Sequence, residues 1–92
     1  MRKITIEMAS AFENNENKTL SNTEVKDNKM YLWGNCIAKK ENGKTYINMC
    51  GYNTNTTRER LNGLSGVNIK SKDFTPYLNG IKISSCGWYE VK

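Results

Sequence analysis

Histidine is absent from this chain of 92 residues, and its absence removes several common kinds of active site. Histidine is the usual general base near neutral pH, the usual partner of a nucleophilic cysteine or serine, and the commonest zinc ligand. The acidic residues fall mostly in expected loops or beside basic residues, and no two of them stand out as a catalytic pair. We therefore expect a protein that is not an enzyme and that uses neither a metal nor another cofactor.

Cysteine is also scarce. The three cysteines are an odd number, and no two of them are spaced as C-x-x-C, so the sequence predicts neither a disulfide framework nor a zinc cluster. The hairpin register described below places Cys36 and Cys50 on opposite faces of a sheet, where they cannot easily bridge. We expect reduced thiols and no intramolecular disulfide.

Long apolar runs are missing, and only one proline is present. The apolar runs are too short to cross a bilayer, and the N-terminus lacks the apolar core of a signal peptide, so we expect a cytoplasmic protein. With 92 residues, of which 37% are hydrophobic, the chain suits one small domain, residues 1–92, with a lean core.

Positive charge exceeds negative charge. Fourteen Lys and Arg residues against nine Asp and Glu residues give a formal net charge of +5. This excess favours a polyanion or an acidic protein as a partner, although a charge of this size is also ordinary in soluble proteins.

The clearest feature that is present is the dipeptide Asn42-Gly43. Asn-Gly between alternating residues predicts a type I′ hairpin, because both turn positions need a positive φ. The register that follows pairs Glu41 with Lys44, Ala38 with Ile47, Cys36 with Met49, and Gly34 with Gly51.

This register sorts the hairpin's side chains into two chemically different faces. One face is small and apolar, and we expect helices to cover it; it carries Ala38, Ile47, Cys36 and Met49. The opposite face is aromatic, polar and partly basic, and it carries Tyr31, Trp33, Asn35, Ile37, Lys39, Tyr46, Asn48, Cys50 and Tyr52. The second face is either a binding surface or a second core layer, and the sequence leaves both open.

The segment from residue 4 to residue 12 fits two structures. Ile4, Ile6 and Met8 alternate as in a strand, whereas Met8, Ala11 and Phe12 share one helical face. We favour the helix because of its alanine content.

Around this helix, Thr5 is available as the N-cap, and residues 13–18 lack an apolar anchor and predict a mobile loop. A short strand over residues 21–25 should turn through residues 27–28 into a long strand. Gly34 interrupts that long strand, which predicts a bulge or a close packing contact.

A second helix is indicated by Thr56 and Glu59, which have capping-box spacing, and by Gly63, which is placed to end the helix in the left-handed conformation. We expect less than about two turns. The free backbone amides at the start of this helix, together with Arg58 and Arg60, could bind an anion. The alternative is that the helix only connects its neighbouring elements and that both arginines are exposed to solvent.

The C-terminal part repeats the hairpin signal. Val67 and Ile69 predict a strand, and residues 79–80 are a second Asn-Gly turn. The expected pairs are Leu78 with Ile81, Tyr77 with Lys82, and Pro76 with Ile83, with Pro76 at a sheet edge. A final extended segment contains Trp88, Tyr89 and Val91. The expected fold is α+β: a mostly antiparallel sheet, built from two Asn-Gly hairpins, with one or two short helices on one face.

Four segments together resemble small accessory proteins encoded by bacteriophages and prophages. They are residues 21–25 (SNTEV), 30–35 (MYLWGN), 56–64 (TTRERLNGL) and 77–80 (YLNG). This resemblance implies a role such as inhibition of host defence or modulation of host replication or transcription. It implies no functional residues. The chain departs from the pattern where a tryptophan often follows Leu-Asn-Gly, because Ile81-Lys82-Ile83 stands there instead.

Two functional hypotheses follow. The first is a non-catalytic phage protein that binds and inhibits or modulates a host protein machine, such as a nucleic-acid-guided defence complex. Its partner-binding residues would be Trp33, Lys39, Tyr46 and Tyr52, on the aromatic face. A small virion or assembly component is the plainer reading of the same phage resemblance.

The second hypothesis is direct binding of nucleic acid. The aromatic residues would stack on bases, and the phosphates would meet Lys39, Lys40, Lys44, Arg58 and Arg60. A basic stripe is missing from the linear sequence, and aromatics beside lysine on a sheet are often ordinary cross-strand packing.

Overall fold

The computed structural model describes residues 2–91 and has the α+β architecture that the sequence predicted. In chain order the elements are α1 (Lys3–Glu13), β1 (Lys18–Leu20), β2 (Thr23–Lys26), β3 (Lys29–Leu32), β4 (Asn35–Glu41), β5 (Lys44–Ile47), α2 (Asn55–Asn62), β6 (Ile69–Lys72), β7 (Thr75–Leu78), β8 (Ile81–Lys82) and β9 (Tyr89–Val91). The helix favoured for residues 4–12 is confirmed. β1 begins at Lys18, which was expected to belong to a loop.

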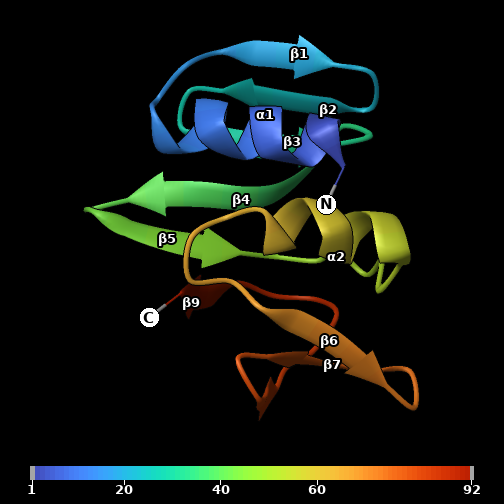
Figure 1. Cartoon of the computed structure of the whole chain (residues 1–92). Helices are drawn as coiled ribbons and strands as arrows, with labels where there is room; N and C mark the ends of the chain where they lie inside the picture. The colour runs from blue at the N-terminus through green and yellow to red at the C-terminus, as the bar shows by residue number, and fades with distance from the viewer. Residues whose placement is uncertain (1, 92) are drawn as a thin grey trace.

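The strands form two antiparallel sheets (Figure 1). The larger sheet has the order β1-β2-β3-β4-β5-β9, so the last strand of the chain returns to pair with β5. The smaller sheet has the order β6-β7-β8. The two predicted Asn-Gly hairpins are both present, one in each sheet. Both helices lie on the same side of the larger sheet (Figure 1).

Two-residue turns join the strands from β1 to β5 in the larger sheet and from β6 to β8 in the smaller sheet. At Asn42-Gly43 both φ angles are positive, 53° and 76°, as a type I′ turn requires. Asp27-Asn28 turns in the same way, as expected. Bulky residues also occupy such positions: Phe74 has a φ of 64° and is 97% exposed.

The long strand predicted across Gly34 is wrong, because the chain reverses there. Trp33 and Gly34 both have positive φ and form the turn between β3 and β4. The glycine therefore serves a hairpin and not a bulge inside one strand. Asn35 now pairs with Leu32, on the core side of the sheet.

The predicted register of the first hairpin is confirmed for the residues that pair as strands in the structure. Glu41 pairs with Lys44 and Ala38 with Ile47, and the 0% exposure of Ala38 and Ile47 places this face in the core. β5 ends at Ile47, so the predicted strand pairs at Met49 and Gly51 do not form.

A bulge lies further along β4 than expected. Met30 pairs with Ala38 but Tyr31 pairs with Cys36, which leaves Ile37 as the extra residue. An extra residue inverts the alternation beyond it. Ile37, predicted on the aromatic face, is therefore buried at 1% exposure, and Cys36 takes the outer face instead of the apolar one.

The hydrophobic core lies between the larger sheet, the helices and the inner side of the smaller sheet. Its fully buried members include Met8 and Phe12 of α1, Met30 and Ile47 of the larger sheet, and Leu61 of α2. Residues of β6 and β7 belong to the same buried cluster. One core therefore serves both sheets.

Both predicted N-caps are wrong. The N-cap of α1 is Arg2, without a side-chain hydrogen bond, and Thr5 is buried within the helix. The N-cap of α2 is Thr54, whose Oγ1 accepts the N–H of Thr57 at 3.2 Å, two residues before the predicted Thr56. α2 has eight residues and is thus slightly longer than two turns.

Gly63 ends α2, but not in the left-handed conformation, since its φ is −73° and its ψ is −19°. The glycine is needed for close approach of the two helices. A Cβ at Gly63 would lie 2.5 Å from Cγ2 of Thr5 and 3.3 Å from Cβ of Ala9. Packing between α1 and α2 therefore depends on the missing side chain.

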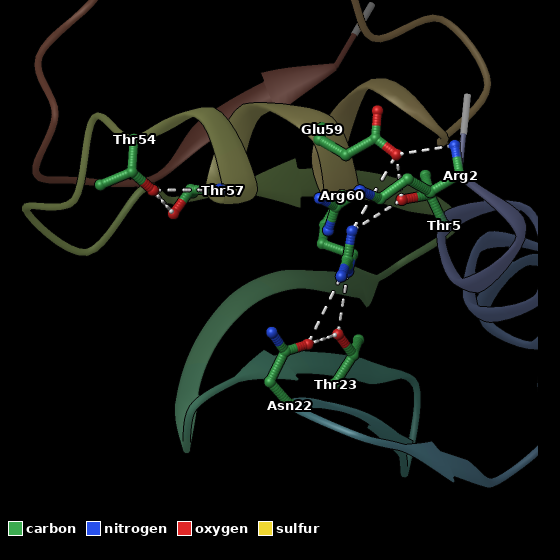
Figure 2. Close-up of polar contacts among 8 residues, drawn as sticks. All are labelled: Arg2, Thr5, Asn22, Thr23, Thr54, Thr57, Glu59 and Arg60. Carbon is green, nitrogen blue, oxygen red and sulfur yellow. Dashed lines mark hydrogen bonds and ion pairs between the residues drawn. The ribbon is translucent and has the colours of Figure 1, made fainter.

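A buried arginine connects both helices to the larger sheet. Figure 2 shows the Arg60 side chain between Thr5 of α1 and Thr23 of β2. Its Nη1 donates to Oγ1 of Thr5 at 2.9 Å and its Nε to Oγ1 of Thr23 at 3.0 Å. The two threonine hydroxyls donate onward, to Oε1 of Glu59 at 2.6 Å and to Oδ1 of Asn22 at 2.8 Å. Each hydroxyl thus both accepts and donates a hydrogen bond.

Pro76 was expected at a sheet edge, but it lies in β7, the central strand of the smaller sheet. Its carbonyl accepts the N–H of Ile83 at 3.1 Å, which confirms that these residues oppose each other. β8 ends at Lys82, before Ile83, so no hydrogen bond of the strand ladder is lost because Pro76 lacks an N–H.

Candidate interaction face

The outer face of the larger sheet lies opposite the side that carries the two helices (Figure 1). The register places five side chains in one row across it: Lys26, Lys29, Lys39, Tyr46 and Glu90. Directly opposed residues on neighbouring strands point to the same side, so this row belongs to the outer face. Lys39 and Tyr46, both predicted for the aromatic face, are confirmed there as cross-strand neighbours.

Lys39 is the centre of a compact aromatic and charged cluster. Its Nζ lies 4.4 Å from the ring centroid of Trp88 and 5.8 Å from that of Tyr46. The same Nζ is 3.5 Å from Oε2 of Glu41, and the Lys39 side chain is 25% exposed. An ammonium held against aromatic rings is stabilised by the ring quadrupole. The Lys39 ammonium and the two rings thus contact one another within the chain itself.

Trp88 is the member of this cluster that sequence reasoning missed. It is 40% exposed and precedes β9, the strand that pairs with β5. Trp88 and Glu90 are two residues apart, and such spacing was the one local signal that they share a face. This spacing does not show which residues lie beside Trp88, because that depends on the β5–β9 pairing between distant parts of the chain.

The other two predicted aromatic residues lie outside the cluster. Trp33 is 58% exposed at the β3–β4 turn, and Tyr52 is 51% exposed in the segment between β5 and α2. Neither is on a strand of the outer face. Their predicted placement beside Lys39 and Tyr46 in one strand register is therefore wrong.

The five residues predicted for phosphate contacts do not share one surface. Lys39 and Lys44 are on the outer face, where Lys44 Nζ is 3.8 Å from Oε2 of Glu90. Lys40 points to the helix side, where its Nζ donates to the carbonyl of Glu13 at 3.0 Å.

The two arginines are occupied within the fold. Arg58 donates to Asn53 and Asn55 at the start of α2. Arg60 is only 2% exposed, so the expectation that it contacts solvent or phosphate is wrong. Two strong hydrogen bonds to threonine hydroxyls make this burial tolerable.

The cysteines were expected to be reduced, and all three are free thiols in the structure. Cys50 lies beyond the end of β5, so the face argument does not apply to it; its Sγ donates to the carbonyl of Cys36 at 3.0 Å. Burial raises the pKa of Cys36 and of Cys50. Both thiols are therefore protonated at neutral pH and are weak nucleophiles. Among residues 2–91, no three Cys, Asp or Glu side chains are grouped so that they could hold a metal ion.

Comparison with protein families gives one finding. The model of the family described as Kyanoviridae Gp96 protein matches residues 1–91. The chain belongs to this family. It is therefore a phage protein, which confirms the resemblance at that level. Comparison with curated proteins and with solved structures found no match. No helix within residues 2–91 is long and apolar enough to cross a membrane.

In this member of the Kyanoviridae Gp96 family, the segment 56–64 has a structural explanation. Arg60 and Glu59 belong to the buried network, and Leu61 is in the core. Asn62 bonds both the N–H and the carbonyl of Ile69, which attaches α2 to the smaller sheet. The most distinctive segment of the sequence thus holds the fold together, and the candidate face lies elsewhere.

Proposed function

We propose that this phage protein is a non-catalytic accessory protein that binds a host protein machine and modulates or inhibits it. The observation that carries the proposal is the ordered cluster of Lys39, Tyr46 and Trp88 on the outer face of the larger sheet. Aromatic residues beside a charge are the usual anchors of protein interfaces. Because the Lys39 ammonium already lies near both rings, we expect little side-chain entropy to be lost on binding.

Mixed charge on this face favours a protein partner over nucleic acid. The outer face carries the carboxylates Glu24, Glu41 and Glu90 as well as its lysines. Two of these carboxylates are within ion-pair distance of Lys39 and Lys44. A phosphate-binding face is typically dominated by cations, whereas interspersed charges suit a complementary protein surface.

The partner that we propose is a host protein or a protein–nucleic-acid complex in the bacterial cytoplasm. A nucleic-acid-guided defence complex is one machine of this kind. Membership in a phage family supports the setting, since an accessory phage protein acts inside an infected cell. A non-enzymatic mode of action is part of the proposal.

Affinity capture from host lysate, with nuclease added, tests the proposal. The tagged full chain is compared with a Lys39→Glu variant, which reverses the central charge. Lys3→Glu is the matched control, because Lys3 is exposed on α1 and the variant has the same change in net charge. We expect one host protein to be captured by the wild type and by the control, and to be lost with Lys39→Glu.

The affinity of the captured protein is then measured with Tyr46→Ala. We expect binding to weaken by about 1–3 kcal/mol, the range for an aromatic anchor, and to change little at moderate salt. Equal capture by all variants would remove this face from the proposal, and capture of no protein would remove the host partner. A loss of folding stability of about 3–5 kcal/mol in Tyr46→Ala would show a packing role instead.

A further inference from the structure

The smaller sheet has an outer face of its own, with a chemistry that differs from the first. Tyr77 of β7 lies at its centre, directly opposite Lys70 of β6 on one side and Lys82 of β8 on the other. Lys72 is two residues from Lys70 and so points to the same side. Three lysines therefore surround one tyrosine.

Burial separates the two sides of this sheet. Ile69, Pro76 and Leu78 alternate with these residues and are buried against the core. The three lysines are exposed and Tyr77 is half-buried. A shallow hollow of about 400 Å³ opens over the face and is lined by Asn68, Lys70, Lys72, Tyr77 and Gly80.

Charge on this face is of one sign. The strands β6, β7 and β8 contain no Asp or Glu, and the nearest acidic residue along the chain is Asp73 in the β6–β7 turn. Within residues 2–91, none of Lys70, Lys72 and Lys82 lies within 4.0 Å of a carboxylate oxygen. Their mutual repulsion does not stabilise the fold, whereas an anionic ligand would relieve it.

We propose that this lysine and tyrosine face binds single-stranded nucleic acid. The lysines would meet successive phosphates, and a base would stack on the Tyr77 ring. A sheet face with a central aromatic suits unpaired bases, whose flat sides are accessible, and does not fit a duplex groove. The site uses none of the basic residues that the sequence singled out, and it is independent of the protein-binding face on the larger sheet.

Fluorescence anisotropy with a labelled single-stranded DNA of about 16 nucleotides tests this inference. The full chain is titrated between about 50 and 200 mM salt. The first variant is Lys70→Ala/Lys72→Ala/Lys82→Ala. Its matched control is Arg2→Ala/Lys3→Ala/Lys18→Ala, which loses the same charge from exposed positions outside both proposed faces.

We expect the variant of the smaller sheet to bind at least about tenfold more weakly, and the slope of log K against log salt to become shallower by about 2, because three phosphate contacts are lost. The control should stay within about threefold of the wild type. Equal losses in the two triple variants would show unlocalised attraction and would overturn the site.

Tyr77 supplies the test of stacking. Tyr77→Phe keeps a ring and should bind like the wild type, whereas Tyr77→Leu keeps apolar packing and should bind about tenfold more weakly. Thermal melts of both variants check that the sheet is folded. Unchanged binding by Tyr77→Leu, or tighter binding of polyglutamate than of the oligonucleotide, would indicate an acidic protein ligand and contradict the proposal.

Discussion

At the scale of single residues, Arg60 is a charged side chain that is buried and connects several elements of the fold. Its guanidinium contacts hydroxyls from α1 and β2, and within residues 2–91 no buried side-chain nitrogen or oxygen lacks a hydrogen-bond partner. Burial lowers the pKa of Arg60, while the nearby carboxylate of Glu59 opposes that effect. The network replaces the water that the guanidinium gives up.

Removing this side chain should strongly destabilise the protein. We expect Arg60→Ala to lower the free energy of unfolding by about 2–4 kcal/mol, because two buried hydroxyls lose a charged donor and a cavity is left. Arg58→Ala is the control, since Arg58 is only partly buried and bonds locally; a loss within about 1 kcal/mol is expected. Urea denaturation measures both, and similar losses would contradict a special role for Arg60.

Glu59 adds a pH dependence to the same network. The hydrogen bond from the Thr5 hydroxyl, helped by the N–H of Arg2, lowers the pKa of Glu59 below its ordinary value of 4.5. A carboxyl whose pKa is lower in the folded state stabilises the fold fully above the unfolded-state pKa. It loses that contribution as pH falls through the folded-state pKa.

We therefore expect the free energy of unfolding to fall when the pH drops below about 4.5. Glu59→Gln should make this acid limb shallower than in the wild type, and Thr5→Val, which removes the hydroxyl donor, should do the same with Glu59 in place. Urea midpoints measured from about pH 6 to pH 3 give the comparison. An acid limb of unchanged slope in both variants would contradict the assignment.

At the scale of elements, the packing of α1 against α2 depends on the contact made at Gly63. Gly63 has ordinary helical angles, so an alanine there meets no backbone strain, and the contact with Thr5 and Ala9 alone sets the cost. We expect Gly63→Ala to reduce stability by about 1–3 kcal/mol, the range for overpacking.

A second substitution makes this prediction specific. Thr5→Ser removes Cγ2, the atom nearest to the new Cβ, and keeps the hydroxyl that bonds Arg60. Gly63→Ala should therefore cost less in the Thr5→Ser background than in the wild type, as a double-mutant cycle would show. Strict additivity would mean that the two helices do not meet through this contact.

At the scale of the whole molecule, one core joins the two sheets. Leu78 of the smaller sheet and Met30 of the larger sheet belong to the same buried cluster, although the sheets share no strand. Small domains with one core usually unfold in a single step. We therefore expect the two proposed binding faces to be carried by one folding unit.

Leu78→Ala tests this unity. We expect a loss of about 2–4 kcal/mol, with circular dichroism and tryptophan fluorescence following one common transition. Trp33 stands at the β3–β4 turn of the larger sheet, whereas Trp88 lines a hollow together with Leu78 and Ile81 of the smaller sheet, so tryptophan fluorescence reports on both sheets. Two separated transitions would show that the smaller sheet folds independently.

Local features were determined by the sequence alone. The turns at Asp27-Asn28, Asn42-Gly43 and residues 79–80, the helix over residues 4–12 and the pairing of Ala38 with Ile47 all depend on a few neighbouring residues. Turn geometry and helical spacing act over such short distances. The α+β class followed from these elements.

Only the tertiary structure decided which of these features make the candidate faces. Trp88 joins Lys39 because β9 returns to β5, Ile37 enters the core because a bulge inverts the alternation, and Arg60 is buried because two other elements supply hydroxyls. Each outcome depends on residues far apart in the chain. Long-range strand pairing and burial depend on how the whole chain packs, so the residues next to Trp88, Ile37 or Arg60 in the sequence do not determine where these side chains lie.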